Sequence, residues 1–343
     1  MSNTSPLVTT LMQSEASAAA DAVARQAMEA EAALNAVTQR LRRSPPALAL
    51  TCARGSSDHA ASYAKFLLET RLGLPTVSFP PSLSSLYGAS LRGTENAVFI
   101  AISQSGRSPD LLAATRAARR DGALVIGLVN DATSPLAELV DVLLPLAAGE
   151  EVSVAATKSY IATLAMVARL VARWSDDREF QAAVAGLPPL LRTAWDADWR
   201  AAVEPLAQAS SVFVLGRGST LGIAQEAALK LKETCAIHAE AFSLAEVAHG
   251  PMTLVEPGFP VLVFTPLDVD HAAAQPILRT LREAGADLLI VGDERLPAVG
   301  GAHAALAPIT MIQSFYGLAN EVALARGRDP DRPPLLRKVT QTR

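Results

Sequence analysis

The sequence predicts an α/β protein built from two copies of one module, each organised around a parallel β-sheet. Three observations support this fold class. The chain has 343 residues, more than one ordinary domain, and half of them are apolar, which suffices for sizeable cores. Short apolar runs alternate with segments of helix length, as in βαβ units. In addition, several sequence fragments recur at a nearly constant spacing.

The recurring fragments lie in the same order in both halves of the chain. Residues 53–57 (ARGSS) return as 216–220 (GRGST), residues 69–70 as 233–234, and residues 119–123 as 282–286. The offsets between these fragments are 163, 164 and 163 positions. Three matches in register over about 70 residues indicate a tandem duplication of one α/β unit.

The individual elements follow from local patterns. Residues 11–43 mix Ala, Met, Val and Leu with Glu and Arg at helical spacing, and predict one or two leading helices. Apolar runs bounded by turn residues predict strands at 47–52, 97–102, 124–129, 142–146, 211–215, 260–265 and 287–291. Helices are expected at 59–70, 110–121 and 159–173. Residues 175–208 also have helical character, with Trp174, Trp195 and Trp199 as packing anchors.

Composition excludes several classes of protein. A net charge of −4 and a pI near 5.8 argue against nucleic-acid binding, which requires a basic face. Two cysteines, Cys52 and Cys235, are too few for a disulfide framework or a thiolate zinc site. The N-terminus lacks the basic and apolar regions of a signal peptide. We therefore expect a cytoplasmic protein that needs no metal.

One uncharged stretch, residues 296–320, has to be compared with a membrane span. It contains prolines and glycines, among them Pro297, Gly300 and Pro308, which break or polarise a spanning helix. A buried strand or loop that leads into a core helix is the better interpretation. No membrane partner is expected.

A serine-rich segment, residues 103–110 (SQSGRSPD), is the first candidate for chemistry. It follows an apolar run and opens a helix, with Ser108 suited to the N-cap and Pro109 to the first helical position. Backbone N–H groups, hydroxyls and the positive end of the helix dipole meet there, as in an anion site. A capped turn without a ligand is the alternative, but these side chains exceed what capping needs. The equivalent residues of the second copy, 265–270, include two aspartates, so only the first copy should bind phosphate.

Two further loops have weaker signals. Residues 54–57 (RGSS) follow the first strand, and the carboxyl ends of parallel strands place them beside the serine-rich segment. Residues 149–158 precede a helix, and their Thr157 and Lys158 either contact a ligand or merely cap and solvate that helix.

The richest segment runs from residue 226 to residue 251. Glu226, Lys230 and Glu233 share one helix face, which in an isolated helix is most simply a solvated, salt-bridged face. The repeat register instead places Glu233 at the end of the helix that begins at a strand-end loop, and a polar stretch rather than a strand is expected after it. His249 follows in a turn. A positioned carboxylate and a histidine form an acid–base pair, whereas His59, His271 and His303 lack metal-ligand spacing.

These motifs resemble those of the SIS (sugar isomerase) family, specifically the tandem pair that forms the isomerase half of glutamine–fructose-6-phosphate aminotransferase. The resemblance covers residues 45–343, because the motifs occur in order at matching spacing. The matching segments are SQSGRSPD at 103–110, VAATK at 154–158, LGRG at 215–218, EAALKLKE at 226–233, IHAE at 237–240, HGP at 249–251 and PPLLRKVT at 333–340.

The resemblance implies a fold and a domain plan. Each module would be a flavodoxin-like, doubly wound parallel sheet. The expected organisation is leading helices at 1–45, a phosphate-binding SIS domain at 46–174, a helical linker at 175–208, a second SIS domain at 209–326 and an active-site tail at 327–343.

The resemblance also implies roles for single residues. Glu233 would move a proton between C1 and C2 of a sugar phosphate. His249 would help to open the sugar ring, in the site of the neighbouring subunit of a homodimer. Lys338 would contact the open-chain sugar. The implied substrate and phosphate ligands are Ser56, Ser57, Ser103, Gln104, Ser105, Ser108, Ala155, Thr157, Glu226 and Lys230. No cofactor and no metal are implied.

Departures from the family pattern shape the expected reaction. We expect no glutaminase domain ahead of the leading helices. Ala156 replaces the usual Ser, Arg107 replaces Glu, and Pro334-Leu335 replace Arg-Asn. Such chains resemble the type II glucosamine-6-phosphate deaminases, which would convert glucosamine 6-phosphate to fructose 6-phosphate and ammonia. An aminotransferase-like isomerase, or an isomerase of another sugar or amino-sugar phosphate, is the alternative. A sugar-phosphate sensor without catalysis is disfavoured, because Glu233, His249 and Lys338 are all present and no basic recognition helix occurs in the first 45 residues.

Overall fold

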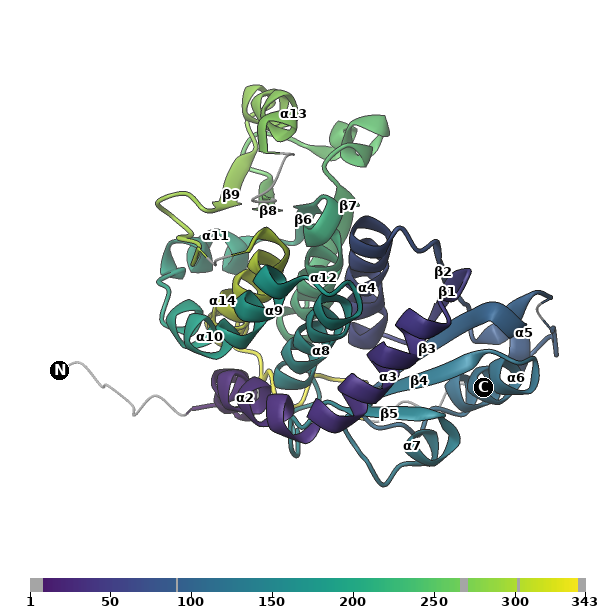
Figure 1. Ribbon diagram of the computed structural model, residues 1–343. Coiled ribbons are helices and arrows are strands. Elements are labelled where there is room, and N and C mark those ends of the chain that lie inside the picture. The colour runs from purple at the N-terminus through teal and green to yellow at the C-terminus, as the bar shows by residue number, and fades with distance from the viewer. Residues whose placement is uncertain (1–8, 91, 266–270, 301–302, 339–343) are drawn as a thin grey trace.

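The computed structural model describes residues 9–90, 92–265, 271–300 and 303–338, and it contains two parallel β-sheets (Figure 1). The first sheet has the order β2-β1-β3-β4-β5, with strands Thr76–Ser78, Leu48–Cys52, Ala97–Ser103, Leu124–Val129 and Val142–Pro145. This is the 2-1-3-4-5 order of flavodoxin-like folds. The second sheet has the order β7-β6-β8-β9, with strands His238–Ser243, Ser211–Gly216, Pro260–Phe264 and Asp287–Val291. The predicted α/β fold with two parallel modules is confirmed.

The duplication inferred from the sequence is visible in the strand positions. Strands β1, β3 and β4 begin at Leu48, Ala97 and Leu124, and strands β6, β8 and β9 each begin 163 positions later. The order of these strands is also the same in both sheets. Among the described residues, the fifth strand of the first sheet, β5, has no counterpart in the second.

The sequence patterns missed one edge strand in each module. These strands are β2, which pairs with β1, and β7, which pairs with β6. The segment after Glu233, expected to be polar and without a strand, is β7, which pairs in parallel with β6 along its whole length. β2 is an edge strand of three residues. Edge strands are hydrogen-bonded on one side only and need few apolar residues, so their composition is a weak signal. Here, pairing with the neighbouring strand decides the conformation.

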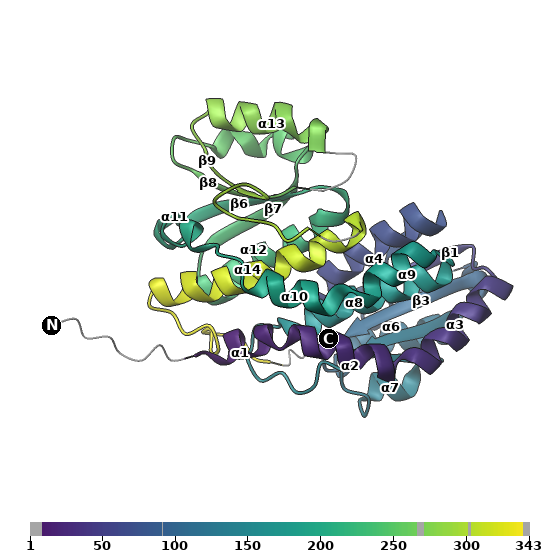
Figure 2. The same cartoon turned by 60° about the vertical axis from the view of Figure 1, so that its left-hand side comes forward.

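The leading segment forms three helices instead of one or two. They are α1 (Leu11–Ser17), α2 (Ala19–Glu29) and α3 (Glu31–Arg43), joined through Ala18 and Ala30. Both joints keep right-handed helical angles and carry no side-chain cap, so no breaker residue marks them in the sequence. Figure 2 shows these helices alongside the first module, where α2 and α3 pack against α8 (Lys158–Trp174).

Helices from both modules form a layer between the two sheets (Figures 1 and 2). One apolar core joins side chains of this layer to inward-facing residues of both sheets, such as Val98 and Leu262. Smaller cores lie on the outer face of each sheet. The main helices of the layer are α4 (Ser56–Leu72), α8, α12 (Leu221–Cys235) and α14 (Ala307–Ala325), and the outer helices are α6 (Pro109–Arg120), α7 (Pro135–Leu139) and α13 (His271–Glu283).

The segment between the modules is helical, as expected, with α9 (Arg178–Ala185), α10 (Leu187–Trp195) and α11 (Val203–Gln208). Trp174 and Trp199 are buried, and the Trp199 indole N–H donates to the carbonyl of Pro297 at 3.0 Å. The uncharged stretch leads into the core helix α14. Among the described residues, no helix is long and apolar enough to cross a membrane.

Candidate functional site

A cavity of about 300 Å³ lies at the carboxyl ends of strands β1 and β3. The serine-rich segment, the loop after β1 and the tail meet in its wall, although they are far apart in the sequence. The lining residues are Arg54, Gly55, Ser56, Ser57, Ile102, Ser103, Gln104, Ser105, Ser108, Leu111, Val154, Ala156 and Lys338. Six of the ten predicted substrate and phosphate ligands are among them, and so is one of the three predicted catalytic residues.

The N-termini of two helices open into this cavity. α4 begins at Ser56, directly after Gly55, and α6 begins at Pro109, after the N-cap Ser108. The Ser108 hydroxyl makes no capping hydrogen bond, so it is available to a ligand. Unpaired backbone N–H groups and the positive ends of both helix dipoles therefore favour an anion at this place.

The turn of the serine-rich segment depends on Gly106. Its φ is +64°, and an added Cβ would lie 2.1 Å from the Ser134 hydroxyl oxygen. The Gly106 N–H donates to the Ser103 hydroxyl at 2.9 Å, which closes the turn. Only glycine fits this conformation and this space, so the motif keeps the serines around the cavity.

The tail lysine, Lys338, is held in the cavity wall by a buried carboxylate. Its Nζ donates to Glu151 Oε2 at 3.1 Å and to the Ser153 carbonyl at 2.7 Å. Glu151 also accepts hydrogen bonds from the Thr157 N–H at 3.0 Å and from the Ser159 hydroxyl at 2.6 Å. Burial raises the pKa of the Glu151 carboxyl, but Lys338 and these hydrogen bonds outweigh it and hold the pKa below its ordinary value.

Two predicted ligands, Ala155 and Thr157, do not line the cavity. Both are fully buried behind its wall, where their neighbours Val154 and Ala156 face the space. Successive residues of this non-helical segment point to opposite sides, which sequence spacing alone does not assign. The Thr157 hydroxyl is buried and has no hydrogen-bond partner among the described residues.

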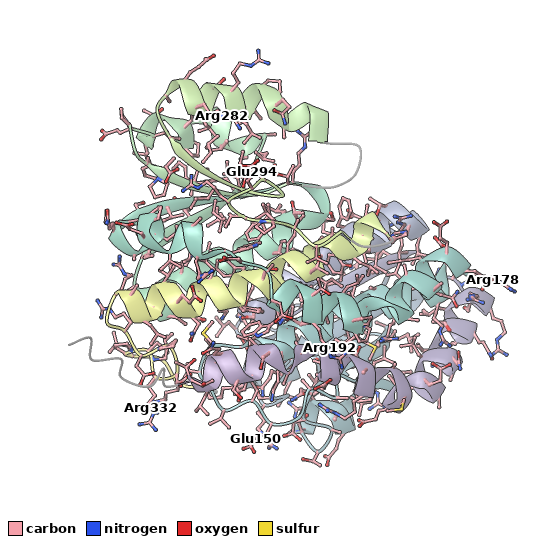
Figure 3. All side chains as sticks on the ribbon, turned by 90° about the vertical axis from the view of Figure 1, so that its left-hand side faces the viewer. Glu150, Arg178, Arg192, Arg282, Glu294 and Arg332 are labelled. Atoms are coloured by element: carbon pink, nitrogen blue, oxygen red, sulfur yellow. The ribbon has the colours of Figure 1, made fainter. Side chains whose placement is uncertain are left out.

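A second group of charged side chains is buried in α12. Lys230 contacts Glu226 Oε1 at 3.5 Å and forms a short ion pair with Glu233, whose side chain is partly exposed. Glu226 and Lys230 are almost completely buried, so the solvated-face interpretation is wrong. By contrast, the labelled Arg178, Arg192 and Arg282 in Figure 3 are exposed on the outer surface.

The charge of Lys230 is maintained by its partners. Burial lowers the pKa of the Lys230 ammonium, but Glu226 and Glu233 raise it by more, and the net pKa lies above the ordinary value. α12 thus presents a buried cation beside Glu233, a carboxylate that remains reachable from outside.

Helix α4 connects this group with the cavity. Ser56 and Ser57 at its N-terminus line the cavity, and His59, in the same first turn, places Nδ1 3.0 Å from Glu226 Oε2. The Tyr316 hydroxyl donates to Glu226 Oε1 at 3.3 Å from α14. The sequence predicts no role for His59, because this residue lacks metal-ligand spacing. Its contact arises from the packing of two repeats, which no local pattern reveals.

The remaining predicted residues lie away from the cavity. Glu226, Lys230 and Glu233 do not line it, and His249 is exposed on a short 3₁₀ turn, Glu246–His249. Its place in the site of a neighbouring subunit stays a prediction. Among the described residues, no group of three or more His, Cys, Asp or Glu side chains could hold a metal ion.

Sequence reasoning missed two residues that the structure brings to the cavity. Arg54 lines it, although only the serines of its loop were named as ligands. Glu151 anchors Lys338 from 187 positions away. The sequence signal for Arg54 was its place in the loop after β1. Glu151 had no sequence signal, because only the fold brings the tail to this segment.

Comparison with known proteins supports the resemblance. The SIS domain model matches residues 49–173 and 205–318. Glutamine–fructose-6-phosphate aminotransferase [isomerizing] of Aeropyrum pernix is 36% identical over 310 residues, and the match covers 83% of this chain and 49% of that protein. The enzyme of the same name from Symbiobacterium thermophilum is 35% identical over 307 residues, and this match covers 83% of this chain and 50% of that protein. The chain spans about half the length of these relatives.

A solved structure resembles the whole chain. The "putative phosphosugar isomerase" from Silicibacter pomeroyi DSS-3 has a TM-score of 0.89 and 40% sequence identity, and the match covers 94% of this chain and 100% of that one. The matched regions contain both sheets and most of the cavity wall. The resemblance expected from the motifs is confirmed, and the chain belongs to the SIS domain family.

Proposed function

We propose that this protein is an aldose–ketose isomerase that acts on the open-chain form of a sugar phosphate. This is the alternative in the sequence analysis, and the family membership supports it better than the narrower deaminase assignment. The observation that carries it is the single cavity in which two helix N-termini, four serines outside the strands and a tail lysine converge. A phosphate group matches this set of donors.

The proposed proton transfer uses the charged group of α12. Glu233 takes the proton from C2 of the aldose, which gives an enediolate. A proton passes from O2 to O1, and Glu233 then returns its proton to C1, which forms the ketose. Lys230 lies beside Glu233 and forms an ion pair with it. The sugar chain has to extend from the phosphate toward α12 for this step. Binding the open chain at two ends removes much of the entropic cost of the reaction.

Deamination of glucosamine 6-phosphate is the narrower form of this proposal. The same proton transfer would precede loss of the C2 nitrogen as ammonia, with water supplying the oxygen of fructose 6-phosphate. Ala156 bears on the choice of substrate. It faces the cavity where the family pattern has Ser, so the wall lacks one hydroxyl for the sugar. The substrate therefore need not be that of the aminotransferase.

Proton exchange with solvent tests the proposal directly. Fructose 6-phosphate, glucose 6-phosphate, glucosamine 6-phosphate and galactosamine 6-phosphate are incubated with the protein in D₂O, with and without glutamine. NMR follows deuterium at C1 and C2, and a coupled assay follows ammonia. Isomerisation predicts exchange with at least one of these sugars. Ammonia from an amino sugar would support the deaminase form, and exchange without ammonia would exclude it.

Glu233→Gln tests the assignment of the base. Loss of a general base lowers turnover by about 10²–10⁴-fold, while calorimetric binding of the sugar phosphate should persist. Glu204→Gln is the control, since Glu204 is exposed on α11 and away from the cavity. Turnover at the wild-type rate in Glu233→Gln would contradict the proposed role.

A further inference from the structure

We propose that Arg54 is a specificity-determining residue that recognises the charge of the substrate's phosphate group. The inference deepens the proposed function, on which it rests for the identity of the substrate class. Arg54 lies two residues after strand β1 and lines the same cavity as Ser56, Ser57 and Ser103. It and Lys338 are the two cationic side chains among the lining residues.

The guanidinium of Arg54 is held in place by the carboxylate of Asp110. Its Nε and Nη2 lie 2.9 Å and 2.8 Å from Asp110 Oδ2, in the first turn of α6. The Asp110 side chain is completely buried, whereas that of Arg54 is 50% exposed. Nη1 takes no part in these bonds, and its donors remain for a ligand. A buried carboxylate thus orients an arginine that lines the cavity.

Arg54 supplies a positive charge, which the serines lack. Hydroxyl and backbone N–H donors recognise the positions of the phosphate oxygens, but they are neutral and distinguish weakly between one and two negative charges. A guanidinium forms charge-assisted hydrogen bonds with phosphate, which are roughly twice as strong as neutral ones. Lys338 is already engaged by Glu151 and the Ser153 carbonyl. Arg54 is therefore the residue that should make the site prefer a dianionic phosphate ester.

The chain contains a matched control for this residue. Arg119 lies near the end of α6, its Nε pairs with Asp141 Oδ1 at 3.1 Å, and its side chain is 51% exposed. Arg54 and Arg119 are therefore alike in exposure and in having a carboxylate partner. They differ in that Arg119 does not line the cavity.

The experiment compares Arg54→Gln, Arg54→Lys and Arg119→Gln in the full chain at pH 8. Binding of inorganic phosphate, fructose 6-phosphate and fructose 6-sulfate is measured by calorimetry, and KM and kcat are measured with the active sugar phosphate. At this pH a phosphate ester is a dianion, because its second pKa is about 6, whereas the sulfate ester is a monoanion. The two esters are nearly isosteric, so their affinity ratio reports charge recognition.

We expect Arg54→Gln to weaken binding of both phosphate ligands about tenfold to a hundredfold, the usual effect of losing a hydrogen bond to a charged group. KM should rise by a similar factor with kcat nearly unchanged, and the preference for phosphate over sulfate ester should fall. Arg54→Lys should restore part of the affinity, because it keeps the charge. Arg119→Gln should bind both phosphate ligands as the wild type does.

Two results would overturn the assignment. One is wild-type phosphate affinity in Arg54→Gln. The other is an equal loss for phosphate and sulfate esters, since a merely structural role for the Arg54–Asp110 pair weakens both alike. Failure of the isomerase proposal is separate from these results. A wild-type protein that binds phosphate through Arg54 but isomerises no sugar phosphate would support the Arg54 assignment and overturn the proposed reaction.

Discussion

Two cationic side chains at the cavity, those of Arg54 and Lys338, are held in position by buried carboxylates. Asp110 orients Arg54, and Glu151 anchors Lys338. A buried carboxylate is costly without partners, and each of these two has a cation and further hydrogen bonds. The cations consequently stay at the cavity wall, where a ligand can reach them. Removal of either carboxylate should therefore affect both stability and the site.

Glu151→Gln should lower the free energy of unfolding by about 3 kcal/mol at pH 7, because it breaks a buried ion pair. The pKa of the folded carboxyl lies below its ordinary value of 4.5, so its contribution is fully present above that pH. It is lost as the pH falls through the lower, folded pKa. Urea unfolding from pH 7 to pH 3 should show a constant difference from the wild type down to about pH 4.5 and a shrinking one below.

The neighbouring Glu150 is the control for this substitution. Its side chain is exposed and is labelled at the edge of the molecule in Figure 3. Glu150→Gln should change stability by less than about 0.5 kcal/mol. An unchanged difference between wild type and Glu151→Gln at pH 3 and pH 7 would contradict the role of an ionised Glu151.

At the scale of elements, the packing of α12 on α4 connects the two repeats. Gly222 of α12 sits against the α4 backbone, where an added Cβ would lie 2.6 Å from the His59 carbonyl oxygen and 3.2 Å from the Tyr63 nitrogen. This close approach sets the position of His59 relative to Glu226, which it contacts at 3.0 Å. A glycine between the helices therefore allows the contact between α4, which lines the cavity, and the charged group of α12.

Gly222→Ala should lower the free energy of unfolding by about 1–3 kcal/mol, the usual effect of overpacking, despite the better helix propensity of Ala. Gly317→Ala in α14 is the matched control, since its Cβ would meet only Trp195 Cζ3 at 3.9 Å. That variant should be as stable as the wild type or up to about 1 kcal/mol more stable. Urea unfolding measures both, and similar values for the two variants would argue against close packing at Gly222.

At the scale of the whole molecule, the two repeats divide the proposed work. The first supplies the anion-binding cavity, and the second supplies Glu226, Lys230 and Glu233. One core and the helix layer hold the halves together, so the two sets keep a defined relation. His249, exposed on the second repeat, is the predicted residue that would act in a second copy of the chain.

Complementation between two inactive variants tests this arrangement. In a two-fold dimer formed from Glu233→Gln and His249→Ala subunits, one site carries both substitutions and the other carries neither. Random pairing on co-expression should therefore restore about a quarter of the wild-type activity per subunit. Sedimentation should show a dimer. No recovery in co-expressed, dimeric protein would place His249 in the site of its own subunit or outside any site.

The sequence predicted those structural features whose signal lies within a few neighbouring residues. The strands β1, β3, β4, β6, β8 and β9 are apolar runs between turn residues, and all six lie where the pattern placed them. The edge strands β2 and β7 were missed, because pairing with a neighbour decides their conformation. In the same way, the serine-rich turn was predictable from its own residues, since Gly106 and the cap at Ser108 are local features.

Periodicity, spacing and capping within a few residues encode the duplication, the parallel modules and the serine-rich turn, so these features were predictable from the sequence. Which distant groups meet depends on tertiary packing. Arg54 with Asp110, His59 with Glu226 and Lys338 with Glu151 are 56, 167 and 187 positions apart. Such contacts depend on the packing of repeats and tail around a shared core, and chain position carries no direct record of that packing.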